Sequence, residues 1–190
     1  MPYAVIKRVI DLAASLVACV VLLPVFVLIA LAICVESSGA PIFTQRRVGL
    51  YGREFAIFKF RSMVKNAASQ GLWYTTKDDP RITRVGKFLR ATSLDELPQL
   101  WNVTLGDMSL VGPRPNLASQ QSQYSAADWQ LRHRVRPGIT GLAQVSGRSA
   151  LSEKEQIRYD LAYAANPTLL GDMRILWRTV LVVVGRVGVN

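Results

Sequence analysis

The strongest constraint on the fold is a long apolar run from Leu12 to Val35, in which Ser15 is the only polar side chain. Its 24 residues exceed the roughly 20 that an α-helix needs to cross the hydrocarbon core of a bilayer. A helix buried inside a soluble protein is seldom so long or so apolar on every face. We therefore predict that this segment inserts into a membrane.

The charges around the run bear on how it inserts. Basic residues flank it on both sides, with Lys7 and Arg8 before it, and Arg46, Arg47, Arg53 and Lys59 after it. Because basic flanks stay on the cytoplasmic side, both ends of the run belong there, which favours a re-entrant helix over a straight span. Pro24, near the middle, removes one amide donor and bends the helix. We predict a helix that enters, breaks near Pro24 and returns; a single span is the alternative.

Composition narrows the class of partner. The net charge is +10, the pI is about 10.1, and 50% of the 190 residues are hydrophobic, so the chain is not a disordered basic tail. Anionic partners are expected, namely nucleic acid, an acidic membrane face or phosphorylated small molecules. The 17 arginines against 6 lysines favour phosphate. Two cysteines, both in the apolar run, and one histidine exclude a disulfide framework and a His-rich zinc site. We assign that histidine, His133, a surface or structural role.

The rest of the chain predicts an α-rich α+β fold. Alternating apolar and charged residues over Arg53–Met63 favour a strand. Helices are expected within residues 78–93, 118–135, 152–167 and 168–185, and residues 136–148 are interpreted as a Gly-rich loop. We predict a re-entrant membrane helix over residues 1–36, followed over residues 37–190 by a compact cytosolic domain with amphipathic interfacial helices and a short strand or hairpin.

Two adjacent carboxylates, Asp95 and Glu96, stand out in so basic a chain. The simpler interpretation is helix capping, because Ser93 and Glu96 have the spacing of a capping box. Pro98 is tolerated only in a first turn, so the helix would begin close to Asp95. Amide donors and the helix dipole would then hold the aspartate ionised.

The basic residues around the pair favour a reactive centre instead. Arg90 precedes the pair, Arg114 follows it, and Lys59 and Arg61 are expected to line the same face. Such a cluster binds a dianion, and a fixed, ionised Asp95 beside a bound phosphate can attack phosphorus. Because carboxylate and phosphate repel each other, a divalent cation must bridge them, and Mg²⁺ with Asp95 among its oxygen ligands is the usual choice.

Three segments carry a resemblance to a known family. They are KFRSM (Lys59–Met63), TSLDELPQLWNVTLGDMSLVGPRP (Thr92–Pro115) and RVRPGITGLAQVSGR (Arg134–Arg148). In this order they resemble the signatures of the bacterial sugar transferases, the small monotopic phosphoglycosyl transferases that start membrane glycan assembly. The likeness covers nearly the whole chain and is to the minimal catalytic unit of the family. One difference is that the family breaks its re-entrant helix at a Ser-Pro pair, whereas this chain has Leu23–Pro24.

The resemblance implies a two-step phosphoglycosyl transferase reaction with Mg²⁺ as cofactor. Asp95 would attack the sugar-linked phosphorus of a UDP-sugar, release UMP and carry the phosphosugar to polyprenyl phosphate, such as undecaprenyl phosphate. Glu96 matches the second member of the family's Asp-Glu pair, with metal binding and proton acceptance both open. The likeness also assigns substrate binding to Lys59, Arg61, Arg90, Arg114, Arg136, Arg148 and Asp160. For all of these except Arg90 and Arg114, surface charge or salt bridging is the alternative.

The same resemblance implies a location at the bacterial inner membrane, among its lipids, with the active site on the cytoplasmic face. Two other functions are weighed against it. A non-enzymatic membrane adaptor would bind anionic lipids through the basic face. Nucleic-acid binding lacks a recognisable reader motif, so we expect no nucleic-acid partner. The identity of the sugar, the downstream glycan and the oligomeric state, including a homo-oligomer, stay open.

Overall fold

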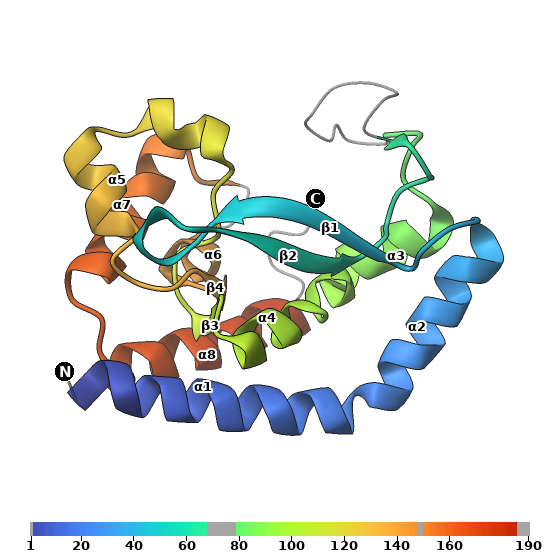
Figure 1. Cartoon of the computed structure of the whole chain (residues 1–190), viewed down its shortest axis with the longest axis horizontal. Helices are drawn as coiled ribbons and strands as arrows, with labels where there is room; N and C mark the ends of the chain where they lie inside the picture. The colour runs from blue at the N-terminus through green and yellow to red at the C-terminus, as the bar shows by residue number, and fades with distance from the viewer. Residues whose placement is uncertain (1, 68–78, 148–149, 186–190) are drawn as a thin grey trace.

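The computed structural model describes residues 2–67, 79–147 and 150–185, and it begins with two helices set at an angle (Figure 1). Helix α1 (Pro2–Val21) and helix α2 (Leu23–Glu36) are bent by 60° at a break at Leu22. Pro24 lies in the first turn of α2, where a backbone amide has no partner within the helix, so the missing N–H does not weaken α2. The same missing N–H cannot donate to α1, so α1 ends before Pro24. Within the described part of the chain, no single helix is long and apolar enough to span a membrane, and only this bent pair reaches that length and composition.

Helix α1 has an unusual distribution of polarity. The side chains that it buries against the rest of the protein are Asp11, Ser15 and Cys19, spaced four residues apart. Its outer face exposes large apolar side chains, such as Val9, Val17 and Val20. A helix of a water-soluble protein has the opposite arrangement, with the apolar face inward.

A β-hairpin follows, as the alternating pattern over residues 53–63 predicted. Strand β1 (Ile42–Val48) pairs antiparallel with β2 (Glu54–Phe60), with Phe43 opposite Lys59 and Arg47 opposite Phe55. Directly paired residues point to the same side of a sheet. Arg47 and Lys59 therefore project from the same face of the hairpin.

The remaining elements are mostly helical. In order they are α3 (Arg84–Thr92), a 3-10 turn at Leu94–Glu96, α4 (Gln99–Leu105), β3 (Ser109–Val111), a 3-10 helix at Ala118–Gln123, α5 (Ala126–Arg132), β4 (Gly138–Thr140), α6 (Leu142–Ser146), α7 (Glu153–Ala165) and α8 (Leu169–Val184). The four helical regions predicted from the sequence are confirmed, although residues 118–135 form two helices that are separated at Tyr124. The expected α-rich fold with small sheets is confirmed as well.

The prediction of an irregular loop over residues 136–148 is wrong. This segment contains β4, which pairs in parallel with β3, and the short helix α6. The pairing depends on two glycines that approach closely, because a Cβ atom on Gly138 would overlap the backbone nitrogen of Gly112. A strand of three residues is too short to show an alternating pattern in the sequence, so the glycines of this segment indicated a loop.

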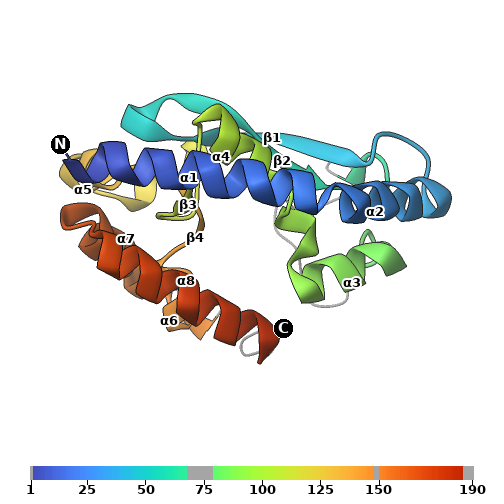
Figure 2. The same cartoon turned by 90° about the horizontal axis from the view of Figure 1, so that it is seen from below.

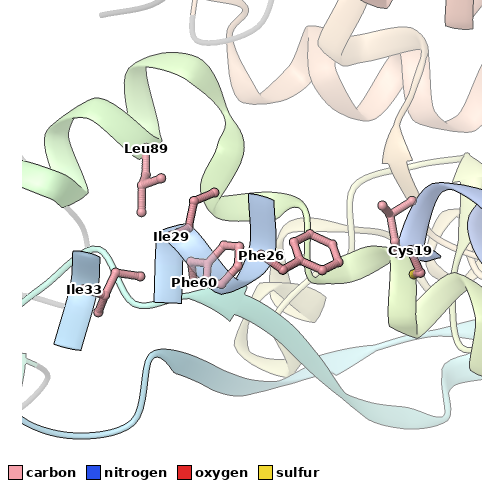
Figure 3. Close-up of a cluster of buried hydrophobic side chains, with 7 residues drawn as sticks. Cys19, Phe26, Ile29, Ile33, Phe60 and Leu89 are labelled. Atoms are coloured by element: carbon pink, nitrogen blue, oxygen red, sulfur yellow. The ribbon is translucent and has the colours of Figure 1, made fainter. Parts of the chain in front are cut away.

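The main hydrophobic cluster joins α2 to the body of the protein (Figure 3). Phe26 of α2 meets Phe60 of β2 edge to face, with 5.8 Å between the ring centroids. Ile33 and Leu89 extend the cluster toward α3. The turn that carries the acidic pair packs on this cluster through Leu94 and Leu97.

Helices α1, α2 and α8 all lie on the underside of the molecule (Figure 2). Helix α8 exposes Leu170, Met173, Trp177 and Leu181, which share one face because they are spaced three or four residues apart. The outer face of α1 exposes a second apolar row on the underside. Isolated apolar residues are common on soluble proteins, whereas grouped exposed apolar residues indicate an interaction site.

Candidate functional site

The acidic pair occupies a tight turn between α3 and α4. Helix α3 ends at Ser93, which has the left-handed backbone conformation (φ 58°), and Asp95 and Glu96 follow in a single 3-10 turn. The capping-box interpretation is wrong, because no side-chain cap is formed at this turn. Helix α4 begins only at Gln99, after Pro98, so Asp95 does not lie in the first turn of an α-helix.

Glu96 is held by two cations. Lys59 Nζ and Arg114 Nη2 both donate to Glu96 Oε1, each at 2.7 Å. Burial alone would raise the pKa of Glu96, but the charges of Arg114 and Lys59 and their hydrogen bonds outweigh it and lower the pKa to about 2. Glu96 is therefore a permanently charged fixed point of the site.

Asp95 has a different environment, although it is the next residue. No salt bridge joins it to another described residue. Burial, and then the negative charge of Glu96, raise the pKa of Asp95, while Lys59, Arg90 and Arg114 oppose that rise. The α-helix N-terminus that was expected to hold Asp95 ionised is not formed at this turn. A carboxylate with a raised pKa and no fixed partner is a better nucleophile than its paired neighbour.

Lys59 reaches Glu96 because a buried asparagine fixes its strand. Asn102 of α4 is fully buried; its Oδ1 accepts from the Phe58 amide at 2.9 Å and its Nδ2 donates to the Ala56 carbonyl at 2.8 Å. These two bonds set the register of β2 against α4. Burial lowers the pKa of Lys59, and the charge of Glu96 opposes this effect. Nothing in the spacing of the sequence pointed to Asn102.

Arg114 is held through its backbone. Arg132 Nη2 donates to the Arg114 carbonyl at 2.6 Å and also to Asp160 Oδ2 at 2.6 Å. Both members of the Arg132–Asp160 pair are buried, with side chains 4% and 3% exposed. Asp160 was predicted to bind substrate. In the structure it forms a buried ion pair with Arg132, and it is connected to the site through Arg132 and the backbone of Arg114.

Arg90 is the second predicted phosphate ligand, and it lies near Asp95. Its Nε donates to Ser62 Oγ at 2.8 Å. This contact needs α3 to approach the chain very closely at Gly86, where a Cβ atom would overlap the Ser62 carbonyl oxygen. The glycine therefore fixes the distance of Arg90 from the turn that carries Asp95.

Three other predicted residues are placed elsewhere or lie outside the description. Arg61 donates to the carbonyls of Ser37 and Ser38 and so binds the loop after α2. Arg136 donates to the Gly106 carbonyl at the end of α4. Arg148 lies outside the described residues. For Arg61 and Arg136, the structure shows contacts that stabilise the fold.

Among the described residues, no group of three or more His, Cys, Asp or Glu side chains is arranged to hold a metal ion. Since Lys59 and Arg114 occupy one oxygen of Glu96, Asp95 is the better placed protein ligand. One carboxylate together with substrate phosphates and water is a usual set of ligands for Mg²⁺. The acidic pair therefore fits a Mg²⁺ ion that is bound jointly with a phosphorylated substrate.

The structure also reveals a basic residue that the site predictions missed. Arg47 of β1 lines a small pocket together with Ile57, Lys59, Gln99, Arg114 and Pro115. The sequence placed Arg47 only among the basic residues that follow the apolar run. The alternation along β1 could have assigned it to the same face as Gln45, but not to a pocket that contains Arg114.

Comparison with known proteins shows the family of the chain. The family model described as bacterial sugar transferase matches residues 2–186. The chain therefore belongs to the bacterial sugar transferase family.

Several curated proteins are similar over almost the whole chain. The UDP-galactose-lipid carrier transferase of Erwinia amylovora is 42% identical over 96% of this chain and 41% of its own length. A UDP-glucose:undecaprenyl-phosphate glucose-1-phosphate transferase of Caulobacter vibrioides is 42% identical over 92% of this chain and 68% of its own length. The undecaprenyl-phosphate galactose phosphotransferase of Salmonella typhimurium is 39% identical over 96% of this chain and 41% of its own length. The chain spans about two fifths of the length of the first relatives that it matches.

Proposed function

We propose that the chain transfers a phosphosugar from a UDP-sugar to undecaprenyl phosphate and releases UMP, as a Mg²⁺-dependent phosphoglycosyl transferase. The observation that carries this proposal is the unequal environment of two adjacent carboxylates, Glu96 fixed by two cations and Asp95 unpaired beside them. The names of the relatives, which are sugar-phosphate transferases that use undecaprenyl phosphate, support the same reaction.

The reaction proceeds by two displacements at one phosphorus. In the first, an Asp95 carboxylate oxygen bonds to the sugar-linked phosphorus; the bond from that phosphorus to the bridging oxygen breaks, and its electron pair leaves on UMP. In the second, a phosphate oxygen of undecaprenyl phosphate bonds to the same phosphorus and the Asp95 carboxylate leaves. The product is undecaprenyl diphosphosugar. Bound Mg²⁺, when present, supplies positive charge to the phosphate oxygens.

The chain's own residues position the phosphates for these displacements. Glu96 holds the side chains of Lys59 and Arg114 next to Asp95, and the charge of Arg90 also acts on Asp95. Fixed cations of this kind stabilise the charge that spreads over the phosphate oxygens in the transition state. Glu96, with its pKa of about 2, acts as an anchor rather than as a proton acceptor.

We place the protein at the cytoplasmic membrane, with α1 and α2 as a re-entrant pair. Two features support this placement, namely the apolar outer face of α1 and the exposed apolar row on α8. The turn with Asp95 packs through Leu94 and Leu97 on the hydrophobic cluster to which α2 contributes Phe26, Ile29 and Ile33. The site would thus be at headgroup depth, where a lipid phosphate and a soluble nucleotide sugar can meet.

The covalent step is tested with the purified full chain in lipid nanodiscs, Mg²⁺ and a panel of UDP-sugars, without lipid acceptor. We expect release of UMP in an amount that does not exceed the enzyme, and a gain in protein mass of one phosphosugar on Asp95. Asp95→Asn should show neither, whereas Glu153→Gln, an exposed acidic position on α7, should match the parent chain. Turnover with acceptor in the absence of any adduct on Asp95 would contradict the mechanism.

The same variant separates the enzyme from a membrane adaptor. An adaptor would release no UMP with any UDP-sugar, and both the parent chain and Asp95→Asn would bind vesicles of anionic lipid equally. For the enzyme, we expect Asp95→Asn to keep vesicle binding and to lose UMP release with undecaprenyl phosphate present.

A further inference from the structure

Arg47 lies close to the site, but it has no role in the two displacements described above. It projects from the same face of the hairpin as Lys59, because Arg47 pairs with Phe55 and Lys59 with Phe43 in the antiparallel register. Both side chains line the small pocket that also contains Arg114 and Gln99. Gln99 is 2% exposed, so the floor of this pocket is buried and polar.

The contacts of Arg47 leave its charge without a counter-charge. Its Nη1 donates to the Pro115 carbonyl at 3.1 Å and its Nη2 to Gln45 Oε1 at 2.7 Å, both neutral acceptors. Its Nε is buried and has no hydrogen-bond partner. Glu96, the nearby carboxylate, is already shared by Lys59 and Arg114. An arginine that is partly buried without a carboxylate is costly unless an anion binds there.

Shared contacts place Arg47 beside the other cations of the site. Arg47 lines one pocket with Lys59 and Arg114, and both of these donate to Glu96, the residue next to Asp95. Asp95 is not among the described residues that line this pocket. Burial together with the charge of Arg114 lowers the pKa of Arg47 to about 10.

We propose that Arg47 binds the phosphate of the leaving nucleotide, one phosphate away from the phosphorus that Asp95 attacks. This inference rests on the proposed function and adds a residue to the donor site. When the bond to the bridging oxygen breaks, its electron pair becomes negative charge on the UMP phosphate. Arg47, whose own hydrogen bonds go to neutral acceptors, adds positive charge beside Lys59 and Arg114, which share Glu96. The ligand class is a nucleoside monophosphate, recognised here through its phosphate.

The test measures binding without turnover. UMP and uridine are titrated by calorimetry into the full chain in nanodiscs, and into Arg47→Gln and Arg47→Lys. We expect Arg47→Gln to weaken UMP binding roughly 10- to 100-fold, as for loss of a charge-assisted hydrogen bond. Uridine binding should not change, because uridine has no phosphate. Arg47→Lys, which keeps the charge but loses the planar fork, should fall between the two.

The control is Arg46→Gln, since Arg46 is exposed on the opposite face of the same strand. Equal UMP affinity of Arg46→Gln and Arg47→Gln, in a chain that releases UMP from a UDP-sugar, would overturn the role of Arg47 and leave the proposed function standing. Equal weakening of UMP and uridine would also overturn it, because a merely structural contact to Pro115 gives that result. A parent chain that neither releases nor binds UMP would contradict both proposals.

Discussion

Two charge clusters in this molecule can be compared directly. One is the site cluster of Asp95, Glu96, Lys59 and Arg114. The other, which we call the anchor cluster, joins α1 to α8 and consists of Tyr3, Lys7, Asp11, Tyr163 and Asp172. Both contain carboxylates that are close to a lysine and are largely shielded from water, yet they differ in how completely the carboxylates are paired.

In the anchor cluster every carboxylate oxygen has a donor. Asp172 Oδ2 accepts from Tyr3 and Lys7, both at 2.9 Å, and its Oδ1 accepts from Tyr163 at 2.7 Å. Asp11 accepts from the Ser109 hydroxyl and the Leu110 amide. A fully satisfied network of this kind rigidifies a fold and holds α1 in place.

In the site cluster the pairing is uneven. Arg47 donates only to neutral acceptors, and Asp95 has no direct partner among the described residues. Charges that the protein itself leaves uncompensated are available to a ligand. The comparison teaches that burial of charge alone does not identify a reactive site; the incomplete pairing does.

The largest effect is expected when the unpaired carboxylate is removed. Asp95→Asn should lower UMP release by about 10³-fold or more, because the amide cannot act as the nucleophile. The free energy of unfolding should change by less than about 0.5 kcal/mol, since no salt bridge of the described residues is lost. Turnover assays and urea unfolding in detergent measure the two quantities. A large loss of stability would mean that Asp95 is structural, like Asp172.

The reverse pattern is expected in the anchor cluster. Asp172→Asn should cost about 3 kcal/mol of unfolding free energy, because it leaves the charge of Lys7 and two tyrosine hydroxyls poorly compensated. Turnover per folded molecule should stay within about threefold of the parent chain. Unfolding curves, and activity corrected for the folded fraction, check this. If Asp172→Asn left stability intact and reduced turnover, the distinction between the two clusters would fail.

A smaller effect is expected at Arg132, which connects the buried Asp160 to the backbone of Arg114. Arg132→Lys keeps a charge beside Asp160 but cannot also donate to the Arg114 carbonyl. The free energy of unfolding should therefore fall by about 1–2 kcal/mol. Because Arg114 loses only a backbone anchor, the KM for the UDP-sugar should rise severalfold more than kcat falls. Steady-state kinetics with Arg134→Lys, an exposed neighbour, as control tests this. Equal kinetics in both variants would show that Arg114 needs no such support.

These clusters also show which parts of the molecule the sequence could predict. Local patterns were sufficient for the hairpin strand, for the bent apolar segment and for α7, which begins with a capping box of Ser152 and Glu155. The acidic pair and its partners Lys59 and Arg114 were found through their spacing and their resemblance to a family. Each of these rests on residues that are close in sequence or belong to one motif.

Contacts between distant segments were not predictable in this way. Nothing local indicates that Arg132 holds the backbone of residue 114, or that Asn102 fixes β2. The anchor cluster joins residues about 160 positions apart in the chain. The rise in the pKa of Asp95 was not predictable either, because burial and the neighbouring Glu96 act through tertiary packing rather than through helix position.

The smallest effect is expected from pH, and it involves His133, the chain's one histidine. The His133 Nδ1 lies 2.7 Å from the Trp129 carbonyl, and the backbone carbonyl of His133 accepts a hydrogen bond from the Tyr51 amide. Burial, and then the charge of Arg132, lower the pKa of His133, while the bond to Trp129 opposes them. Arg134 is the other charged neighbour in the chain.

A lowered pKa fixes the sign of the effect. Below the ordinary histidine value of about 6.5, the unfolded chain takes up a proton that the folded chain resists, so stability is complete above that pH and is lost as the pH falls through the folded pKa. The paired anchor cluster should add no such dependence near neutrality. His133→Asn, whose amide can still donate to Trp129, should therefore have a flatter profile of unfolding free energy between about pH 7.5 and 5.5. Parallel profiles would assign the pH dependence to the carboxylates, and the anchor cluster would then be less evenly paired than its contacts indicate.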